Sequence, residues 1–424
     1  MDLPTFSTLL TSGQEVLQAA INLQPRQVDF LRHYQALSRR FAKELARGAL
    51  EIAILRLEAA DKFPFADKLY FTRPALEQAS NYELSAYRAR RYQGFSRVAD
   101  LGCSVGGDTL ALAAVLPVIG VDRDPLRLRM AQANLAVCDL SEKVNFIQAD
   151  LTASLPFVPG LKSAYPDPES TSLSLFFDPA RRTEERRVFS VKGYQPPLSV
   201  IKSWLDRFPA LGVKISPGVK LVELAEYDAE VEFISLRGEL KESVLWFGPL
   251  KTAYRRAVVF SGGVAPGPYI LAAEEQAFSL KTLPLSKPQA YLYEPDPAIL
   301  RAGLVVALGL QLEAAQLDPD IAYLTASTLV RTPFARVWAV ADWFPFQLKH
   351  LRAYLRERNV GQVVVKKRGS PIEPEALIRD LKLKGDEERV IFLTHLRGRP
   401  IVVVCCGGNP SAPGTRKGEI IPTR

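Results

Sequence analysis

The stretch "RVADLGCSVGGDTLALA", Arg97 to Ala113, decides the fold. An apolar run that ends at Asp100 leads into three glycines, and an apolar helical pattern follows. Glycines at such a turn let the backbone approach a ligand, because a Cβ would collide with the ligand or forbid the turn. A triphosphate is disfavoured because Asp108 and Thr109 stand where a Walker loop needs Lys and Ser or Thr. A dinucleotide and an amino-acid sulfonium remain compatible with the pattern.

Four successive predicted strands each end in an aspartate, namely Asp100, Asp122, Asp150 and Asp178. Asp122 lies 20 residues after Gly102, where an acidic side chain can accept both hydroxyls of a ribose. An acidic rim suits a cationic methionine group better than a pyrophosphate, which favours positive helix ends. A lone strand-end aspartate is more often a helix cap, the role we predict for Asp124 before Pro125.

The 424 residues are too many for one ordinary domain, and we expect three regions. Residues 1–94 show helical spacing of apolar residues, with Thr72 predicted as a helix cap and Pro74 in the first turn. Residues 95–278 alternate β-branched runs with helical stretches, which predicts a mainly parallel sheet with an antiparallel end. Residues 285–424 form a smaller α/β unit after a linker, with a hairpin around Arg397 and Gly398. The strands expected in the middle region are 98–101, 118–121, 144–148, 173–177, 212–215, 231–236, 244–247 and 257–260.

Composition narrows the class of protein. The net charge of +8 leans weakly toward a polyanionic partner. With four cysteines, three histidines and no metal-ligand spacing, we expect no metal site and reduced, buried thiols. The N-terminus lacks the pattern of a secretory signal, and the longest apolar segment is about half of what spans a bilayer. We therefore expect a cytoplasmic protein without membrane segments.

Residues 97–178 resemble the class I S-adenosylmethionine-dependent methyltransferases. The four stretches that carry the resemblance are "VADLGCSVGGDTLALA", "VIGVDRDPLRLRMAQANL", "VNFIQAD" and "FFDPARR". The glycine pair and "YFTRPALEQAS" (Tyr70 to Ser80) are similar to the trimethylguanosine synthase-like branch. The whole chain resembles methyltransferases with a THUMP-like C-terminal domain. The resemblance implies a Rossmann-like seven-stranded α/β sheet, preceded by helices and followed by a small ferredoxin-like or THUMP-like α/β domain.

The resemblance also implies roles for single residues. Asp100 would hold the methionine amino group, Asp122 the ribose hydroxyls and Asp150 the adenine amino group. Arg123 would flank the adenine, and Asp178, followed by Pro179, would face the acceptor beside the transferable methyl. The complete set of residues expected at the cofactor is Phe71, Thr72, Asp100, Gly102, Ser104, Gly106, Gly107, Asp122, Arg123 and Asp150.

Two departures from the family pattern carry expectations of their own. Ser104 replaces the usual central glycine, which is tolerated if its backbone keeps a negative φ. Ala180 and Arg181 replace the proline and the aromatic ring that usually follow Asp-Pro in methylases of exocyclic amines. Tyr194 could supply a stacking ring from the next loop, or merely pack that loop. Arg181 and Arg182 could grip a phosphate or carboxylate, or form a solvated turn.

Two basic stretches, residues 86–97 and 347–368, favour RNA as the partner, with Lys366, Lys367 and Arg368 as candidate contacts. A solvated helix face is the alternative. The first hypothesis is an RNA base methyltransferase that acts on a nitrogen. The second is a methyltransferase for a small molecule or protein, with the C-terminal unit as a lid or dimerisation domain. The third is a non-catalytic RNA-binding protein that retains the fold. The oligomeric state stays open.

Overall fold

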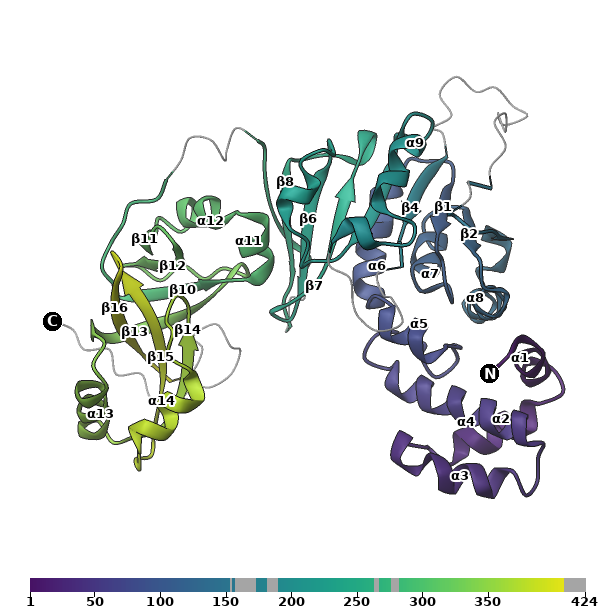
Figure 1. Ribbon diagram of the computed structural model, residues 1–424, viewed down its shortest axis with the longest axis horizontal. Helices are drawn as coiled ribbons and strands as arrows, with labels where there is room; N and C mark the ends of the chain where they lie inside the picture. The colour runs from purple at the N-terminus through teal and green to yellow at the C-terminus, as the bar shows by residue number, and fades with distance from the viewer. Residues whose placement is uncertain (153–154, 157–172, 181–189, 263–266, 276–281, 408–424) are drawn as a thin grey trace. The chain divides into compact units, whose positions relative to one another are not determined.

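The computed structural model describes residues 1–152, 155–156, 173–180, 190–262, 267–275 and 282–407 (Figure 1). Two compact units make up the chain. The first consists of Met1–Ala229 and Val244–Thr252, and the second of Glu230–Ser243 and Ala253–Arg424. The two units are described separately below.

The N-terminal region is helical, as predicted. A long helix, α4 (Lys43–Glu58), buries one face against α1, α2 and α3. Thr72 accepts a hydrogen bond from the Ala75 backbone N–H at 3.3 Å, which confirms it as the cap of α5 with Pro74 in the first turn. The other helices of this region are α1 (Leu3–Leu10), α2 (Gln14–Asn22), α3 (Phe30–Leu37), α5 (Arg73–Gln78) and α6 (Tyr82–Ala89).

A nine-stranded sheet follows, in the order β3-β2-β1-β4-β5-β7-β6-β8-β9. β1 pairs in parallel with β2 and β4, so the ends of these strands meet at one edge. β8 and β9 run antiparallel at the end of the sheet, whereas β6 and β8, two of the strands expected to form the antiparallel end, pair in parallel. β8 and β9 extend the seven-stranded arrangement by two strands, of which β8 was predicted and β9 was not. The strands are β1 (Val98–Leu101), β2 (Val118–Asp122), β3 (Val144–Gln148), β4 (Ser174–Phe177), β5 (Leu211–Ile215), β6 (Glu230–Leu236), β7 (Glu239–Trp246), β8 (Arg255–Phe260) and β9 (Tyr269–Ala273).

Three helices connect the strands that carry the predicted site. They are α7 (Gly107–Ala113), α8 (Pro125–Val137) and α9 (Ile201–Leu205). Asp124 caps α8, because its Oδ1 accepts from the backbone N–H groups of Leu126 and Arg127 at 2.9 and 3.2 Å. This confirms the role predicted for Asp124.

The C-terminal part of the second unit is a seven-stranded sheet in the order β11-β12-β10-β13-β16-β15-β14. The predicted hairpin joins β15 and β16, and Arg397 and Gly398 both have positive φ, as a tight two-residue turn requires. β11 and β12 were not predicted. The elements are β10 (Tyr291–Pro295), α11 (Pro297–Ala302), α12 (Val305–Gln311), β11 (Ala315–Asp318), β12 (Ile321–Ala326), β13 (Ala335–Pro345), α13 (Leu348–Glu357), β14 (Val360–Lys367), α14 (Pro374–Leu381), β15 (Glu387–Leu396) and β16 (Arg399–Cys406).

Helix α11 packs against β6 and β8 inside the second unit. Its Arg301 guanidinium lies over the Phe233 ring, 5.3 Å from the centroid. A cation over an aromatic face is attracted by the ring quadrupole. The last strands of the first sheet are therefore packed together with elements of the C-terminal region.

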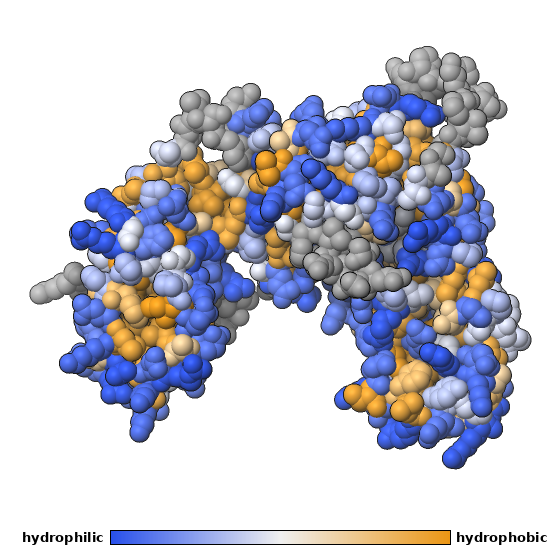
Figure 2. Space-filling model, in the orientation of Figure 1, coloured by the Kyte–Doolittle hydropathy of each residue, from blue (hydrophilic) through white to orange (hydrophobic). Residues whose placement is uncertain are grey.

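The surface is mixed in character. Figure 2 shows a mostly hydrophilic face with separate hydrophobic patches, one of them on the N-terminal helices. Val28 and Leu31 are exposed apolar residues of this helical region. Within the described ranges, the helices are all too short or too polar to cross a membrane.

Candidate cofactor and acceptor site

The glycine loop after β1 is fixed by close backbone contacts. Gly102 has a φ of +85°, and a Cβ there would lie 2.9 Å from the Asp178 carbonyl oxygen. Gly106 has a φ of +84° and precedes α7 as its cap residue. The N–H groups of Gly102 and Cys103 both donate to the Val121 carbonyl, at 2.8 and 2.9 Å. Glycine is needed at Gly102 on both counts, conformation and space.

Ser104 adopts a φ of +50°, so the expectation of a negative φ was wrong. The left-handed conformation brings its backbone N–H to the Asp122 Oδ2, at 2.9 Å. A residue with a Cβ is strained by about 1–2 kcal/mol in this region. Ser104 thus keeps the backbone shape of a glycine, with strain that the hydrogen bond to Asp122 helps to offset.

Asp122 at the end of β2 connects the loop to the next helix. Its Oδ2 accepts from Ser104, and its Oδ1 accepts from the Asp124 backbone N–H at 2.9 Å. The side chain is buried and held in one orientation by both bonds. Each carboxylate oxygen has a second lone pair, so both can still accept a hydroxyl.

Arg123 and Asp150 lie at the exposed margin of this edge. The Gln148 amide donates to the Arg123 carbonyl at 3.2 Å. Asp150 Oδ1 accepts from the backbone N–H and the hydroxyl of Thr152, at 2.9 and 2.7 Å, and these bonds lower the pKa of Asp150. The structure therefore places both residues near the ends of β2 and β3, as the sequence predicted.

Phe71 and Thr72 belong to a segment tied to the glycine loop through Asn134. The Asn134 amide nitrogen donates to the Tyr70 and Val105 carbonyls at 3.0 and 2.8 Å, and its oxygen accepts from the Tyr70 N–H at 2.8 Å. The Phe71 ring is buried and packs against Phe63, with centroids 5.2 Å apart. The Phe71 ring is thus packed in the interior, which argues against the predicted contact with the cofactor.

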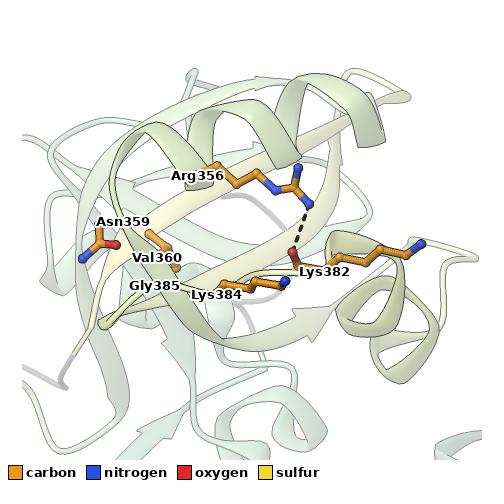
Figure 3. A pocket seen from close by; sticks show the side chains of 6 residues that line it. All are labelled: Arg356, Asn359, Val360, Lys382, Lys384 and Gly385. Carbon is orange, nitrogen blue, oxygen red and sulfur yellow. Dashed lines mark hydrogen bonds between the residues drawn. The ribbon is translucent and has the colours of Figure 1, made fainter.

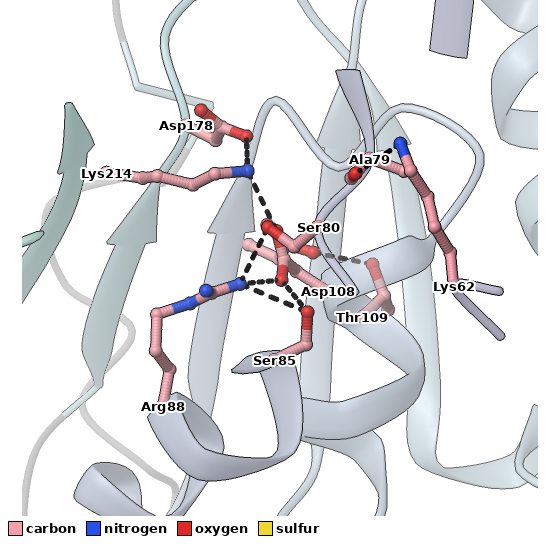
Figure 4. Close-up of polar contacts among 10 residues, drawn as sticks. Lys62, Ala79, Ser80, Ser85, Arg88, Asp108, Thr109, Asp178 and Lys214 are labelled. Carbon is pink, nitrogen blue, oxygen red and sulfur yellow. Dashed lines mark hydrogen bonds and ion pairs between the residues drawn. The ribbon is translucent and has the colours of Figure 1, made fainter. Parts of the chain in front are cut away.

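A buried polar cluster lies beneath the loop (Figure 4). The Thr109 hydroxyl donates to Asp100 Oδ2 at 2.6 Å, and the Ser85 hydroxyl donates to Asp108 Oδ1 at 2.5 Å. Arg88 forms an ion pair with Asp108. The Lys214 ammonium lies 2.7 Å from Asp178 Oδ2 and 3.8 Å from Asp108 Oδ2.

The charges of the cluster sum to zero when the Asp100 carboxyl carries a proton. Burial raises the pKa of Asp100 to about 8, and repulsion from Asp108 adds to the rise. Burial would also raise the pKa of Asp108, but the charges of Arg88 and Lys214 outweigh it and lower that pKa. Two ionised carboxylates, on Asp108 and Asp178, then face two cations. An ionised Asp100 leaves one net negative charge, which a bound cation would neutralise.

Asp178 follows β4 directly, and its backbone N–H donates to the Leu101 carbonyl at 3.1 Å. Pro179 is buried, and Ala180 forms a backbone bridge with Gln195, with N···O distances of 3.2 and 3.0 Å. Asp178 is thereby held at the same edge as Gly102. Arg181 and Arg182 lie outside the described residues.

Tyr194 is fully buried, and its hydroxyl oxygen accepts from the Ser216 backbone N–H at 2.9 Å. A ring in this position cannot stack on a substrate base. The structure therefore supports the packing role that the sequence offered as the alternative.

Arg88 and Lys214 belong to the site but were not predicted from the sequence. Arg88 is 2% exposed and Lys214 is 3% exposed, and both pair with aspartates of the cluster. One signal was available, since Lys214 is a charge inside the apolar strand "LGVKI". Arg88 stood in a basic stretch assigned to RNA, which its burial corrects.

The predicted basic patch on β14 has acidic partners. Lys366 pairs with Glu294 and lies over the Trp338 ring, and Lys367 Nζ lies 2.6 Å from Glu373 Oε1. The Arg368 guanidinium lies over the Tyr323 ring, 5.0 Å from the centroid. These three side chains are thus engaged within the protein, which weakens them as RNA contacts.

Across the residues that the structure describes, no three His, Cys, Asp or Glu side chains gather into a metal-binding group. The four cysteines are free, with Cys103 and Cys405 buried, whereas Cys406 is exposed, contrary to the expectation of burial.

Known proteins resemble this chain along most of its length. Residues 95–172 match the family described as RNA cap guanine-N2 methyltransferase, and residues 335–406 match the family described as THUMP domain-like. A protein of Mycobacterium tuberculosis, named an uncharacterised S-adenosylmethionine-dependent methyltransferase, is 31% identical over 360 residues. That alignment covers 82% of this chain and 92% of the relative. The relative is recorded in strains CDC 1551 and H37Rv with the same values.

A solved structure shares the fold. The crystal structure of a protein assigned as a methyltransferase from Porphyromonas gingivalis W83 superposes with a TM-score of 0.73 at 21% identity. It covers 93% of this chain and 98% of its own. Sheet order, glycine loop and strand-end carboxylates together define a class I methyltransferase fold. The chain belongs to the S-adenosylmethionine-dependent methyltransferases, with a THUMP-like C-terminal region, and S-adenosylmethionine is its cofactor.

Proposed function

We propose that the protein transfers a methyl group from S-adenosylmethionine to a nitrogen of an RNA base. The observation that carries the proposal is Asp178-Pro179 at the end of β4, directly beside the glycine loop. Two family resemblances support it, since one matched family acts on RNA cap guanine N2 and the other is described as THUMP domain-like. Methyl acceptors of other classes are tested below.

The residues at the edge of the sheet fit the cofactor. Gly102 and Gly106 give the loop after β1 its positive-φ shape, and a Cβ on Gly102 would meet the Asp178 carbonyl. Asp122 would accept the ribose hydroxyls, and Asp100 would pair with the methionine ammonium and so complete the charge of the buried cluster. When bound, S-adenosylmethionine supplies an electrophilic methyl group on a sulfonium sulfur and leaves as a thioether.

Asp178 would act on the acceptor. Its carboxylate can accept a hydrogen bond from an exocyclic amine, which turns the nitrogen lone pair toward the methyl group. As the N–C bond forms and the C–S bond breaks, positive charge develops on the nitrogen, and Asp178 stabilises it and takes the proton that the nitrogen loses.

Lys214 would serve as a positioning residue. Its ammonium holds Oδ2 of Asp178 at 2.7 Å and anchors it to the buried Asp108. Because Lys214 is buried on a central strand, its head has little freedom to move. The carboxylate of Asp178 is thus preorganised toward the acceptor side.

The test compares modified nucleosides of RNA from a deletion strain and the wild type by mass spectrometry. A methylated nucleoside should disappear on deletion, return with the wild-type gene, and stay absent with Asp178→Ala. Asp228→Ala is a matched control, because it removes an aspartate that is 95% exposed and pairs with Lys251 at the surface. This control should restore the modification.

An unchanged nucleoside profile would contradict an RNA acceptor. Purified protein incubated with labelled S-adenosylmethionine and cell extract would then show whether label enters protein or small molecules. Binding of S-adenosylmethionine by the Asp178→Ala variant, measured by calorimetry, separates a lost acceptor function from a lost fold.

A further inference from the structure

A cavity in the second unit is lined by cationic side chains and lies between the ends of α13 and α14 (Figure 3). Its volume is about 460 Å³. The lining residues are Arg356, Asn359, Val360, Lys382, Lys384 and Gly385. Three of the six are cations and none is acidic, so the cavity suits an anion.

The cavity wall is built from backbone segments in very close contact. A Cβ on Gly361 would lie 1.6 Å from the Gly385 carbonyl oxygen, and a Cβ on Gly385 would lie 1.9 Å from the Asn359 carbonyl oxygen. That Asn359 oxygen also accepts from the N–H groups of Asp386 and Glu387, at 2.9 and 3.0 Å. The wall is therefore a fixed surface, which lowers the ordering cost of binding.

The three cations are held or presented without acidic partners. Arg356 donates to the Lys382 carbonyl at 3.0 Å, which fixes its guanidinium at the rim. Within the described part of the chain, neither Arg356 nor Lys382 nor Lys384 forms an ion pair. All three are exposed. They differ in this respect from Lys366 and Lys367, whose charges are paired.

We propose that this cavity binds a phosphate group of the RNA backbone. The inference rests on the proposed function, because it concerns how the same RNA substrate is held. A guanidinium fork matches phosphate oxygens in pairs, and lysine heads add compact charges that adapt to the strand. Phosphate contacts of this kind give affinity and orientation without reading sequence.

The test measures binding of the full chain to a fluorescein-labelled RNA stem-loop by anisotropy over a range of salt concentrations. The variant is Lys382→Gln/Lys384→Gln, which keeps Arg356 and its bond to the backbone. Loss of this one phosphate contact should reduce the salt slope by about 0.7 to 0.9. At about 0.15 M salt this corresponds to roughly four- to fivefold weaker binding.

The matched control is Lys366→Gln/Lys367→Gln, which removes the same charge from paired lysines of the same unit. It should keep the wild-type salt slope. Wild-type RNA affinity in the Lys382→Gln/Lys384→Gln variant, or an equal loss of affinity in the control, would refute the cavity as a phosphate site. Neither result would contradict the proposed RNA substrate. Failure of the wild type to bind RNA, with S-adenosylmethionine binding intact, would overturn the RNA substrate as well.

A third measurement distinguishes a phosphate of the RNA backbone from the phosphate of a free mononucleotide. Adenosine monophosphate is titrated into the wild type and the Lys382→Gln/Lys384→Gln variant by calorimetry. If the variant loses this binding but keeps full RNA affinity, the cavity is a mononucleotide site and the RNA assignment is overturned. Weakened RNA binding in the variant supports the proposal whether or not the free nucleotide binds.

Discussion

The proton on Asp100 makes cofactor binding dependent on pH. In the ligand-free protein, burial and the neighbouring Asp108 raise the pKa of Asp100 to about 8, so the carboxyl is mostly neutral at pH 7. Only the ionised carboxylate can pair with the methionine ammonium in the role proposed above. Binding must therefore remove a proton from Asp100, and lower pH opposes it.

The size of the effect follows from two titrations. With a pKa of about 8, Asp100 is roughly 1% ionised at pH 6 and about half ionised at pH 8. The amino group of the ligand, taken to lose its proton near about pH 7.8, is mostly charged at pH 6 and about 40% charged at pH 8. The population of the binding-competent pair therefore rises about 20-fold from pH 6 to pH 8, and affinity rises with it.

Isothermal titration calorimetry with S-adenosylmethionine measures this directly. At pH 7, in buffers of different ionisation enthalpy, binding should release about 0.8 of a proton. Asp100→Asn has no carboxyl to titrate, so its weaker binding should lose the rise between pH 6 and pH 8. An equal dissociation constant at both pH values in the wild type, without proton release, would refute the assigned charge state.

Four further outcomes are expected. As pH rises from about 4 to about 8, the stability of the wild type to urea should fall relative to that of Asp100→Asn, because the folded chain holds a proton on Asp100 that the unfolded chain releases; a constant difference between the two proteins would contradict this. Lys214→Met should lower kcat about 100-fold with little change in cofactor affinity, and Lys214→Arg should retain part of the wild-type kcat. Equal losses of kcat in the two variants would indicate a purely structural role for Lys214. Ser104→Gly should raise stability by up to about 1 kcal/mol in thermal unfolding, because relief of left-handed strain exceeds the entropy cost of glycine; a lower Tm would contradict the strain. Gly102→Ala should cost about 2 kcal/mol or more and weaken cofactor binding, since its Cβ would meet the Asp178 carbonyl; wild-type Tm and affinity would argue against that contact.

Much of the first sheet was predictable because its strands are short β-branched runs between clear turns. β1 and β3 were predicted to the residue; Asp100 and Asp122 lie in the last two residues of their strands, and Asp150 and Asp178 follow theirs. The strands that were missed, β9, β11 and β12, are flanked by prolines and glycines or by Asp-Pro-Asp, which are typical of loops. Pairing with neighbouring strands, which no local pattern reveals, decides their structure.

The residues of the site that stand at strand ends could be predicted from the sequence. The residues whose role depends on an ion pair with a distant part of the chain could not. Asp100 and Asp122 stand at fixed offsets along the chain. Lys214 meets Asp178 across 36 residues, and Lys366 meets Glu294 across 72. Sequence alone shows the charge of such lysines but not its partner. One was therefore overlooked, and the other was assigned to RNA.

The packing of α11 on β6 and β8 limits where the chain of this enzyme can be cut into separately expressed fragments. A cut at the linker before β10 would leave β6 and β8 in one fragment and the helix that covers them in the other. The exposed faces would include Phe233, which is fully buried in the intact chain. Apolar strand surfaces of this kind favour aggregation. The last strands of the first sheet thus share a core with α11, which precedes the THUMP-like residues 335–406, and a fragment that ends before β10 would lack this helix.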